Sequence, residues 1–220
     1  MRGLTRELIA LRVANELRDG MYVNLGFGLP VLVSQFIPAD REVIFESENG
    51  ILDIGGVAEK EEEDLELIDA RATPITLQPG ASFFDSALSF AMIRGGYIDV
   101  SILGAYQVSE SGDLANWSRS LTGPTGNIGG AMDLAAGAKQ VWVMMEHSTE
   151  QGQPRILKQC TYPITAKKVV KLIFTDLALM EVTSEGLCLR EVAPGVTPAE
   201  VQVRTGARIM VGQDVKEIEF

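Results

Sequence analysis

The sequence is poor in two residue types on which many enzymes rely. Its 220 residues include one histidine, His147, and two cysteines, Cys160 and Cys188. A catalytic pair of serine or cysteine with histidine must therefore use His147, and a metal site built from several histidines cannot form within one chain. Two cysteines without a framework of spacings indicate packed, reduced thiols, so we expect a cytoplasmic protein.

Positive charge and long apolar runs are also scarce. Lys and Arg number 19 against 30 Asp and Glu, which gives a net charge of −11. Nucleic acids and anionic membrane surfaces bind through Lys and Arg, so neither is an expected partner. No apolar run approaches the roughly 20 residues of a membrane-spanning helix. The first residues carry charges throughout, and we expect neither a signal peptide nor an anchor.

What is present favours an α/β protein. Strands that alternate with helices indicate an open, mostly parallel sheet flanked by helices. Thr5 and Ser82 are the expected caps of two of the helices. No linker or repeat divides the sequence, so we expect one domain over residues 1–220. The patterns predict helices at 5–19, 31–37, 82–96, 131–138, 165–174 and 197–206, strands at 21–25, 41–47, 74–80 and 140–146, a strand-rich segment at 97–108, and a hairpin at 177–192.

The stretch FESENGILDIGG, residues 45–56, raises the main functional question. Asn49-Gly50 is the strongest two-residue turn signal, and a polar residue such as Glu48 before that turn needs no special reason. Glu48 also follows an expected strand, however, and ligands gather at the carboxyl ends of parallel strands. An ordinary glutamate is ionised at pH 7 and can attack an activated carbonyl without a base. Glu46 could pair with it as in a glycosidase, although neighbours on one strand bracket a sugar poorly.

Two glycine-rich segments are further candidates. NLGFGLP holds Gly26 and Gly28 in a strand-to-helix turn but lacks the third glycine of a dinucleotide-binding motif. A tight turn is the simpler interpretation, and its amides could still face an anionic group. GNIGGAMDL places Gly129 and Gly130 directly before an expected helix. That arrangement is typical either of a flexible loop end or of an oxyanion hole, in which unhindered N–H groups stabilise developing negative charge.

Several of these motifs occur together in one protein family. SENG, PGASFFDSALSFAMIRGG, GDLANW and GGAMDL follow one another in a single order. In this the sequence resembles the family I CoA-transferases, and more narrowly the B (beta) subunits of 3-oxoacid CoA-transferases of the succinyl-CoA:acetoacetate and 3-oxoadipate types. The resemblance implies an enzyme that moves CoA between acyl-CoA and carboxylic acids. Coenzyme A would be a substrate and covalent intermediate, with no permanently bound cofactor and no metal.

The resemblance also assigns roles to residues. Glu48 would be the nucleophile that carries CoA as a glutamyl thioester. The backbone N–H of Gly130 would donate to the oxyanion hole, with Gly129 giving the loop room. We expect Asn49, Gly129, Gly26 and Gly28 to bind substrate. A companion A (alpha) subunit, in an α2β2 assembly, would supply the second oxyanion donor, much of the CoA-binding surface and positive charge for the phosphates of CoA.

The sequence departs from the family pattern close to Glu48. Asp53 stands where relatives commonly have glycine, and Gly56 stands where they have proline. Residues 69–71 read Asp-Ala-Arg where relatives often read Asn-Ala-Gly. If Asp53 faces the site, its charge would disfavour dicarboxylate substrates. Two other functions stay open: an acyl-CoA hydrolase that uses Glu48 but admits water, and a non-catalytic subunit on the same fold.

Overall fold

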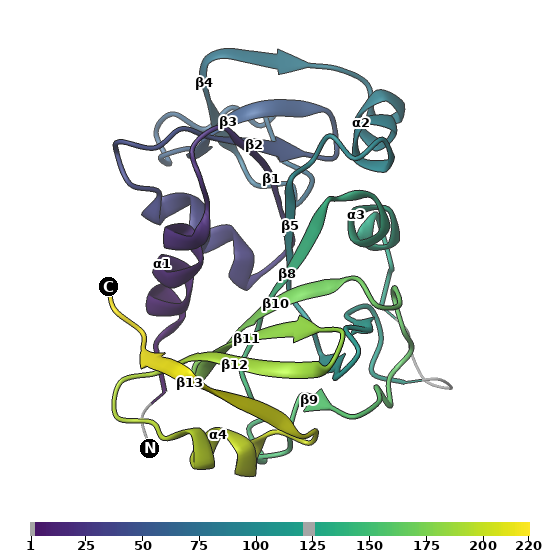
Figure 1. The fold of residues 1–220 in the computed structure, drawn as a ribbon. Coiled ribbons are helices and arrows are strands. Elements are labelled where there is room, and N and C mark those ends of the chain that lie inside the picture. The colour runs from purple at the N-terminus through teal and green to yellow at the C-terminus, as the bar shows by residue number, and fades with distance from the viewer. Residues whose placement is uncertain (1–2, 121–125) are drawn as a thin grey trace.

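The structure, a computed structural model, describes residues 3–120 and 126–220 (Figure 1). Its main element is a sheet of ten strands: Met21–Leu25 (β1), Val43–Ser47 (β2), Ile51–Val57 (β3), Ile75–Phe83 (β4), Val100–Leu103 (β5), Gln140–Met144 (β8), Val170–Phe174 (β10), Ala178–Thr183 (β11), Gly186–Val192 (β12) and Ile209–Glu217 (β13). Their order is β13-β12-β11-β10-β8-β5-β1-β2-β3-β4. The central strands β10, β8, β5, β1 and β2 run parallel, and antiparallel pairs extend the sheet on either side. The expected open, mostly parallel sheet is confirmed.

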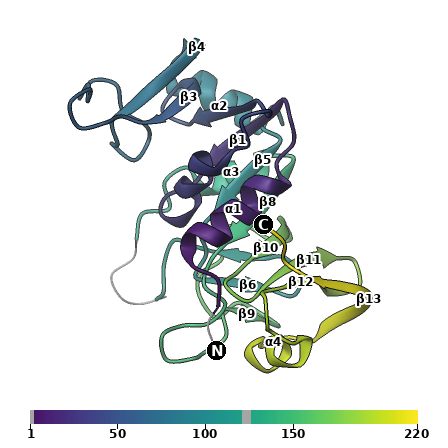
Figure 2. The same ribbon diagram turned by 90° about the vertical axis from the view of Figure 1, so that its left-hand side faces the viewer.

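Helices cover both faces of this sheet (Figures 1 and 2). The helix Arg6–Glu16 (α1) and the 3-10 helix Leu29–Phe36 (η1) lie on one face, whereas Ser86–Arg94 (α2) and Ala131–Gly137 (α3) lie side by side on the other. Among the described residues, no helix is long and apolar enough to cross a membrane. The remaining elements are a small sheet of Gln107–Ser109 (β6), Leu114–Ala115 (β7) and Ile156–Leu157 (β9), and the helix Pro198–Arg204 (α4).

Each face of the sheet has its own apolar core, because successive side chains of a strand point to opposite faces. In β8, Trp142 and Met144 pack with α1, while Val141 and Val143 pack with α2 and α3. All four of these side chains are buried. A strand that is apolar on both faces is typical of a parallel sheet covered by helices on both sides.

The structure differs from the expected elements in several places, and strands β3 and β13 were not predicted at all. The segment 165–174, expected to be helical, ends in strand β10, and that prediction was wrong. Val170, Ile173 and Phe174 are buried there because β10 pairs with both β8 and β11. Tertiary pairing here outweighs the weak helical pattern. The second helix also begins late, since Ser82 belongs to β4 and Asp85 is the N-cap.

The strand order reverses at β1. The chain proceeds from β1 to β2, β3 and β4 on one side and then returns to place β5 and β8 on the other. The carboxyl ends of the parallel strands β2, β1, β5 and β8 therefore meet at one edge of the sheet. Such a reversal leaves a crevice at that edge, and open α/β sheets bind ligands there.

Candidate active site

Glu48 lies in this crevice because a tight turn follows strand β2. Ser47 pairs with Ile51 of β3, so residues 48–50 form the loop of an antiparallel hairpin. Gly50 has a φ of 113°, and a Cβ there would lie 1.9 Å from the carbonyl oxygen of Phe84. Only glycine fits at that position. The tight turn that requires Gly50 therefore also places Glu48 in the crevice.

A buried amide holds the Glu48 carboxylate. Asn24 lies opposite Glu46 in the β1–β2 register, and its Nδ2 donates to Glu48 Oε2 at 3.1 Å and to Glu46 Oε2 at 2.8 Å. Ser89 of α2 donates its hydroxyl to Glu46 Oε1 at 2.7 Å. Both glutamates thus lie on one side and share a donor, rather than facing each other across a substrate.

The two carboxylates have different environments. Glu46 is 3% exposed, whereas Glu48 is half-buried and reaches the crevice. Burial raises the pKa of Glu46, an effect that its hydrogen bonds to Ser89 and Asn24 oppose and the charge of Glu48 strengthens. Glu48 is therefore the more accessible carboxylate of the pair.

The backbone of Gly130 lies beside Glu48. A Cβ built on Gly130 would lie 3.9 Å from Glu48 Cγ and 2.9 Å from Cζ of Phe90. Gly129 before it has a φ of 52°, a left-handed conformation that favours glycine. The Gly-Gly sequence therefore lets the chain turn into α3 while passing close to both Phe90 and Glu48.

A cavity of about 640 Å³ opens in front of Glu48. Its size is within the range of sites that bind large organic ligands. It is lined by Gly26, Phe27, Gly28, Glu48, Gly129 and Gly130, and further by Gly104, Tyr106, Asn116, Trp117 and Asn127 among others. Of the glycine-rich loop 116–130, residues 121–125 lie outside the described residues. The structure thus brings five of the six predicted site residues to one cavity.

The same cavity is lined by the side chains of Arg6, Arg119 and Arg155. Arg119 stacks over the ring of Tyr106, with its guanidinium carbon 4.4 Å from the ring centroid. Positive charge for the CoA phosphates was expected from the companion subunit. This chain itself presents cations at the cavity, despite its net charge of −11.

The remaining predicted residues have distinct surroundings. Gly26 packs tightly on β5, where its N–H donates to the Ile102 carbonyl at 2.8 Å, and Gly28 has a φ of 90°. Asn49 is not among the described residues that line the cavities at Glu48. Its Nδ2 donates at 2.7 Å to the carbonyl of Ile68, so it fastens the segment around Ile68 to the turn after β2. Its expected role in substrate binding stays a prediction.

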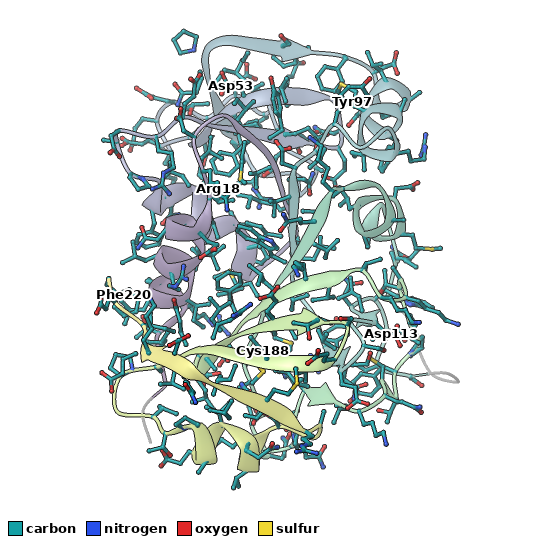
Figure 3. The ribbon with its side chains drawn as sticks, in the orientation of Figure 1. Arg18, Asp53, Tyr97, Asp113, Cys188 and Phe220 are labelled. Carbon is teal, nitrogen blue, oxygen red and sulfur yellow. The ribbon has the colours of Figure 1, made fainter. Side chains whose placement is uncertain are left out.

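A second, smaller cavity lies on the other side of Glu48. Its volume is about 130 Å³, and it shares Glu48 and Phe27 with the larger cavity. Asp53 is absent from the described residues that line either one. It lies in β3 (Figure 3) with a φ of 70°. Together with Arg41 it lines a separate cleft. Repulsion of a dicarboxylate by Asp53 therefore has no structural basis here.

His147 is a packed structural residue. It is fully buried, and its ring nitrogens lie 2.9 and 3.0 Å from the hydroxyls of Thr175 and Thr205. Burial, with the charge of Arg204, lowers the pKa of His147 to about 4. Within residues 3–120 and 126–220, no group of three or more His, Cys, Asp or Glu side chains could hold a metal ion.

Asn24 and the three cavity arginines were not predicted from the sequence. Asn24 carried a usable signal, because it is the one polar residue between apolar neighbours in the strand MYVNL, and a buried amide needs partners. The three arginines carried no such signal in the sequence. Arg6, Arg119 and Arg155 are far apart in the sequence and meet only because the sheet edge, the small sheet and α1 adjoin the same crevice.

Known proteins resemble this chain over nearly its whole length. A family model described as coenzyme A transferase matches residues 6–204. The B subunit of the 3-oxoadipate CoA-transferase of Acinetobacter baylyi is 45% identical over 207 residues, which are 94% of this chain and 95% of that protein. The B subunit of the succinyl-CoA:3-ketoacid coenzyme A transferase of Helicobacter pylori is 48% identical over 209 residues, which are 94% of this chain and 99% of that protein.

A solved structure also has the same fold. An acyl-CoA transferase apoenzyme from Escherichia coli O157:H7 superposes with a TM-score of 0.77 at 18% identity, covering 97% of this chain and 43% of that longer chain. This likeness concerns the fold alone, whereas the family match and the two relatives concern the sequence. The chain therefore belongs to the coenzyme A transferase family.

Proposed function

We propose that this chain is the B subunit of a 3-oxoacid CoA-transferase that moves CoA from an acyl-CoA, with succinyl-CoA as the first candidate, to a 3-oxoacid such as acetoacetate or 3-oxoadipate. The names of the relatives support the reaction class and the candidate acids. The observation that carries the proposal is the placement of Glu48, a half-buried carboxylate between two cavities and beside the backbone of Gly130.

The chemistry we propose passes CoA through Glu48. A carboxylate oxygen of Glu48 attacks the thioester carbonyl of acyl-CoA, the C–S bond breaks, and a mixed anhydride and CoA thiolate form. The thiolate then attacks the glutamyl carbonyl, which releases the first acid as its carboxylate and leaves a glutamyl-CoA thioester. The second acid reverses these steps and regenerates the free carboxylate. This is covalent catalysis with ping-pong kinetics.

The surroundings of Glu48 suit this sequence of steps. Each attack generates an oxyanion, and one well-placed donor typically contributes about 10²–10³ in rate. We assign the N–H of Gly130 to that role, with the second donor on the companion subunit. Asn24 fixes the attacking carboxylate through the hydrogen bond to Oε2. A fixed nucleophile avoids much of the entropic cost of reaching the attack geometry.

A companion A subunit is part of the proposal. Both relatives bear the name of a B subunit, which implies a partner. We further propose an α2β2 assembly in the cytoplasm, with coenzyme A as substrate and covalent intermediate and no permanently bound cofactor. Binding energy from the long CoA tail, held between the two kinds of subunit, would then support the reacting centre.

Product analysis with the companion subunit tests the proposal. With acyl-CoA and an excess of acceptor acid, the wild-type pair should yield the acceptor's CoA ester, whereas Glu48→Ala and Glu48→Gln should yield none. Glu42→Gln is the matched control, because Glu42 is exposed and directly precedes the same strand. Free CoA without transfer would identify an acyl-CoA hydrolase instead. Turnover that survives the loss of Glu48 would indicate a non-catalytic role for this chain.

A further inference from the structure

The smaller cavity beside Glu48 has the features of a binding site for a short acid. Its volume of about 130 Å³ is far below that of the larger cavity and suits a ligand of a few heavy atoms. One part of its wall is apolar, formed by Leu25, Val31, Phe45, Ile54, Val57 and Ile75. Another part is polar, formed by the charged residues Glu46, Glu48, Asp69 and Arg71 with Ser34 and Ser47. Such a mixture of apolar wall and a few placed polar groups is typical of small-molecule sites.

Arg71 is held in place by its neighbours. Its side chain is 16% exposed, and it pairs with Asp69, which is 3% exposed. The Nε donates to Asp69 Oδ2 at 2.7 Å, and Nη2 also donates to that oxygen. Asp69 Oδ1 accepts in turn from the backbone N–H groups of Arg71 and Thr73, at 2.8 and 3.1 Å. The carboxylate therefore fixes the orientation of the guanidinium.

The loop that carries this pair is fastened to the active-site strand. The N–H of Ala70 donates to the hydroxyl of Ser47 at 2.9 Å, and Asn49 donates to the carbonyl of Ile68. Ser47 and Asn49 flank Glu48 in the sequence. Arg71 is thus positioned against the same turn that positions the candidate nucleophile.

One end of the guanidinium is left without a partner. Nη1 of Arg71 is buried and has no hydrogen-bond acceptor in the part of the chain that the structure describes. A buried unpaired donor is costly, and each such group in a folded protein calls for an explanation. Arg71 is also the only positively charged side chain among the described residues that line this cavity. The guanidinium therefore has a donor for which the described residues supply no acceptor.

We propose that the smaller cavity is the acyl subsite and that Arg71 is its specificity-determining residue. The class of ligand is a short carboxylic acid with a polar oxygen, a ketone or a second carboxylate, at the end remote from the reacting carboxyl. The reacting carboxyl lies at Glu48, the carbon chain lies along the apolar wall, and Arg71 binds the remote oxygen. CoA occupies the larger cavity on the other side of Glu48. This inference rests on the proposed transfer reaction.

The test compares acceptor acids of similar length with the wild-type pair and with Arg71→Met. Acetoacetate carries the remote oxygen and butyrate lacks it, while succinate carries a second carboxylate. We expect Arg71→Met to lower kcat/KM for acetoacetate and succinate about ten- to a hundredfold, because a charged donor to a substrate oxygen is lost. The kcat/KM for butyrate should change less than about threefold, because butyrate has no remote oxygen. Arg190→Met removes a more exposed ion pair, with Glu181, that lines neither cavity among the described residues, and should leave all three values unchanged.

A second variant and three outcomes decide the test. Arg71→Lys retains the charge without the planar fork, so it should keep the fold and recover part of the discrimination if Arg71→Met is unstable. Equal losses for all three acids in either variant, or no loss, would overturn the proposal. A wild-type pair that transfers CoA to no acid would refute the proposed function instead. Transfer without discrimination by Arg71 would refute the subsite alone.

Discussion

Replacement of Asn24 by alanine should lower turnover far more than its effect on stability would suggest. The amide of Asn24 donates to both Glu48 and Glu46. A hydrogen bond to a charged group contributes about 1.5–3 kcal/mol, and about 1.4 kcal/mol corresponds to a tenfold change in rate. If the bond to Glu48 positions the attacking oxygen, Asn24→Ala should lower kcat about ten- to a hundredfold.

Ser89→Ala is the matched control for this experiment. The hydroxyl of Ser89 donates to Glu46 and, within the described part of the chain, makes no hydrogen bond to Glu48. Either variant leaves one buried oxygen of Glu46 without its donor, at a cost of about 1–3 kcal/mol in unfolding free energy. The assay is the turnover of acyl-CoA with the companion subunit present and both substrates saturating, beside urea denaturation of each variant. Equal losses of kcat in the two variants, or wild-type turnover in Asn24→Ala, would refute the positioning role of Asn24.

Three other predictions follow from single positions. Gly130→Ala should lower kcat about a hundredfold, because its methyl group would lie 2.9 Å from Phe90 and displace the backbone beside Glu48. The double variant Gly130→Ala with Phe90→Leu should recover part of the rate. A fully active Gly130→Ala would contradict this prediction. Asp53→Gly should raise the unfolding free energy by about 0.5–1 kcal/mol in urea denaturation, because the φ of 70° strains a side chain; lower stability would contradict the strain. His147 remains neutral in the folded state down to its pKa of about 4, whereas in the unfolded chain it takes up a proton near pH 6.5. Its contribution to the free energy of unfolding is therefore fully present above pH 6.5. That free energy falls by about 3 kcal/mol as the pH drops toward 4. His147→Gln should remove most of that pH dependence, and an unchanged slope would show that another group causes it.

Local patterns were sufficient to predict much of the fold. The alternation of apolar strands with helices indicated the parallel centre of the sheet, and Thr5 caps α1 as expected. The hairpin at 177–192 is present as β11 and β12. Segment 170–174 could not be assigned correctly from local pattern, because its strand conformation depends on β8 and β11, which are separate segments of the sequence.

Only part of the candidate site was predictable, because only some of its residues belong to short sequence motifs. Glu48, Gly129 and Gly130 belong to short motifs, and the structure brings all three to one cavity. The contributions of Asn24 and Arg71 depend on register and on the path of a loop. Asn24 meets Glu46 only through the pairing of β1 with β2, and Arg71 reaches the second cavity only because its loop is tied to Ser47. The strand MYVNL marks Asn24 as a buried amide that needs partners, but local sequence does not show which residues those partners are, nor that Arg71 reaches the cavity.

Covalent trapping tests most directly whether Glu48 carries CoA. The purified chain is mixed with its companion subunit and acyl-CoA and treated with borohydride, and the peptides are analysed by mass spectrometry. We expect that the side chain of Glu48 is reduced to an alcohol, that omission of acyl-CoA leaves it intact, and that turnover is lost in proportion to its reduction. An enzyme that transfers CoA at full rate while every Glu48 peptide remains unmodified would contradict the proposed intermediate.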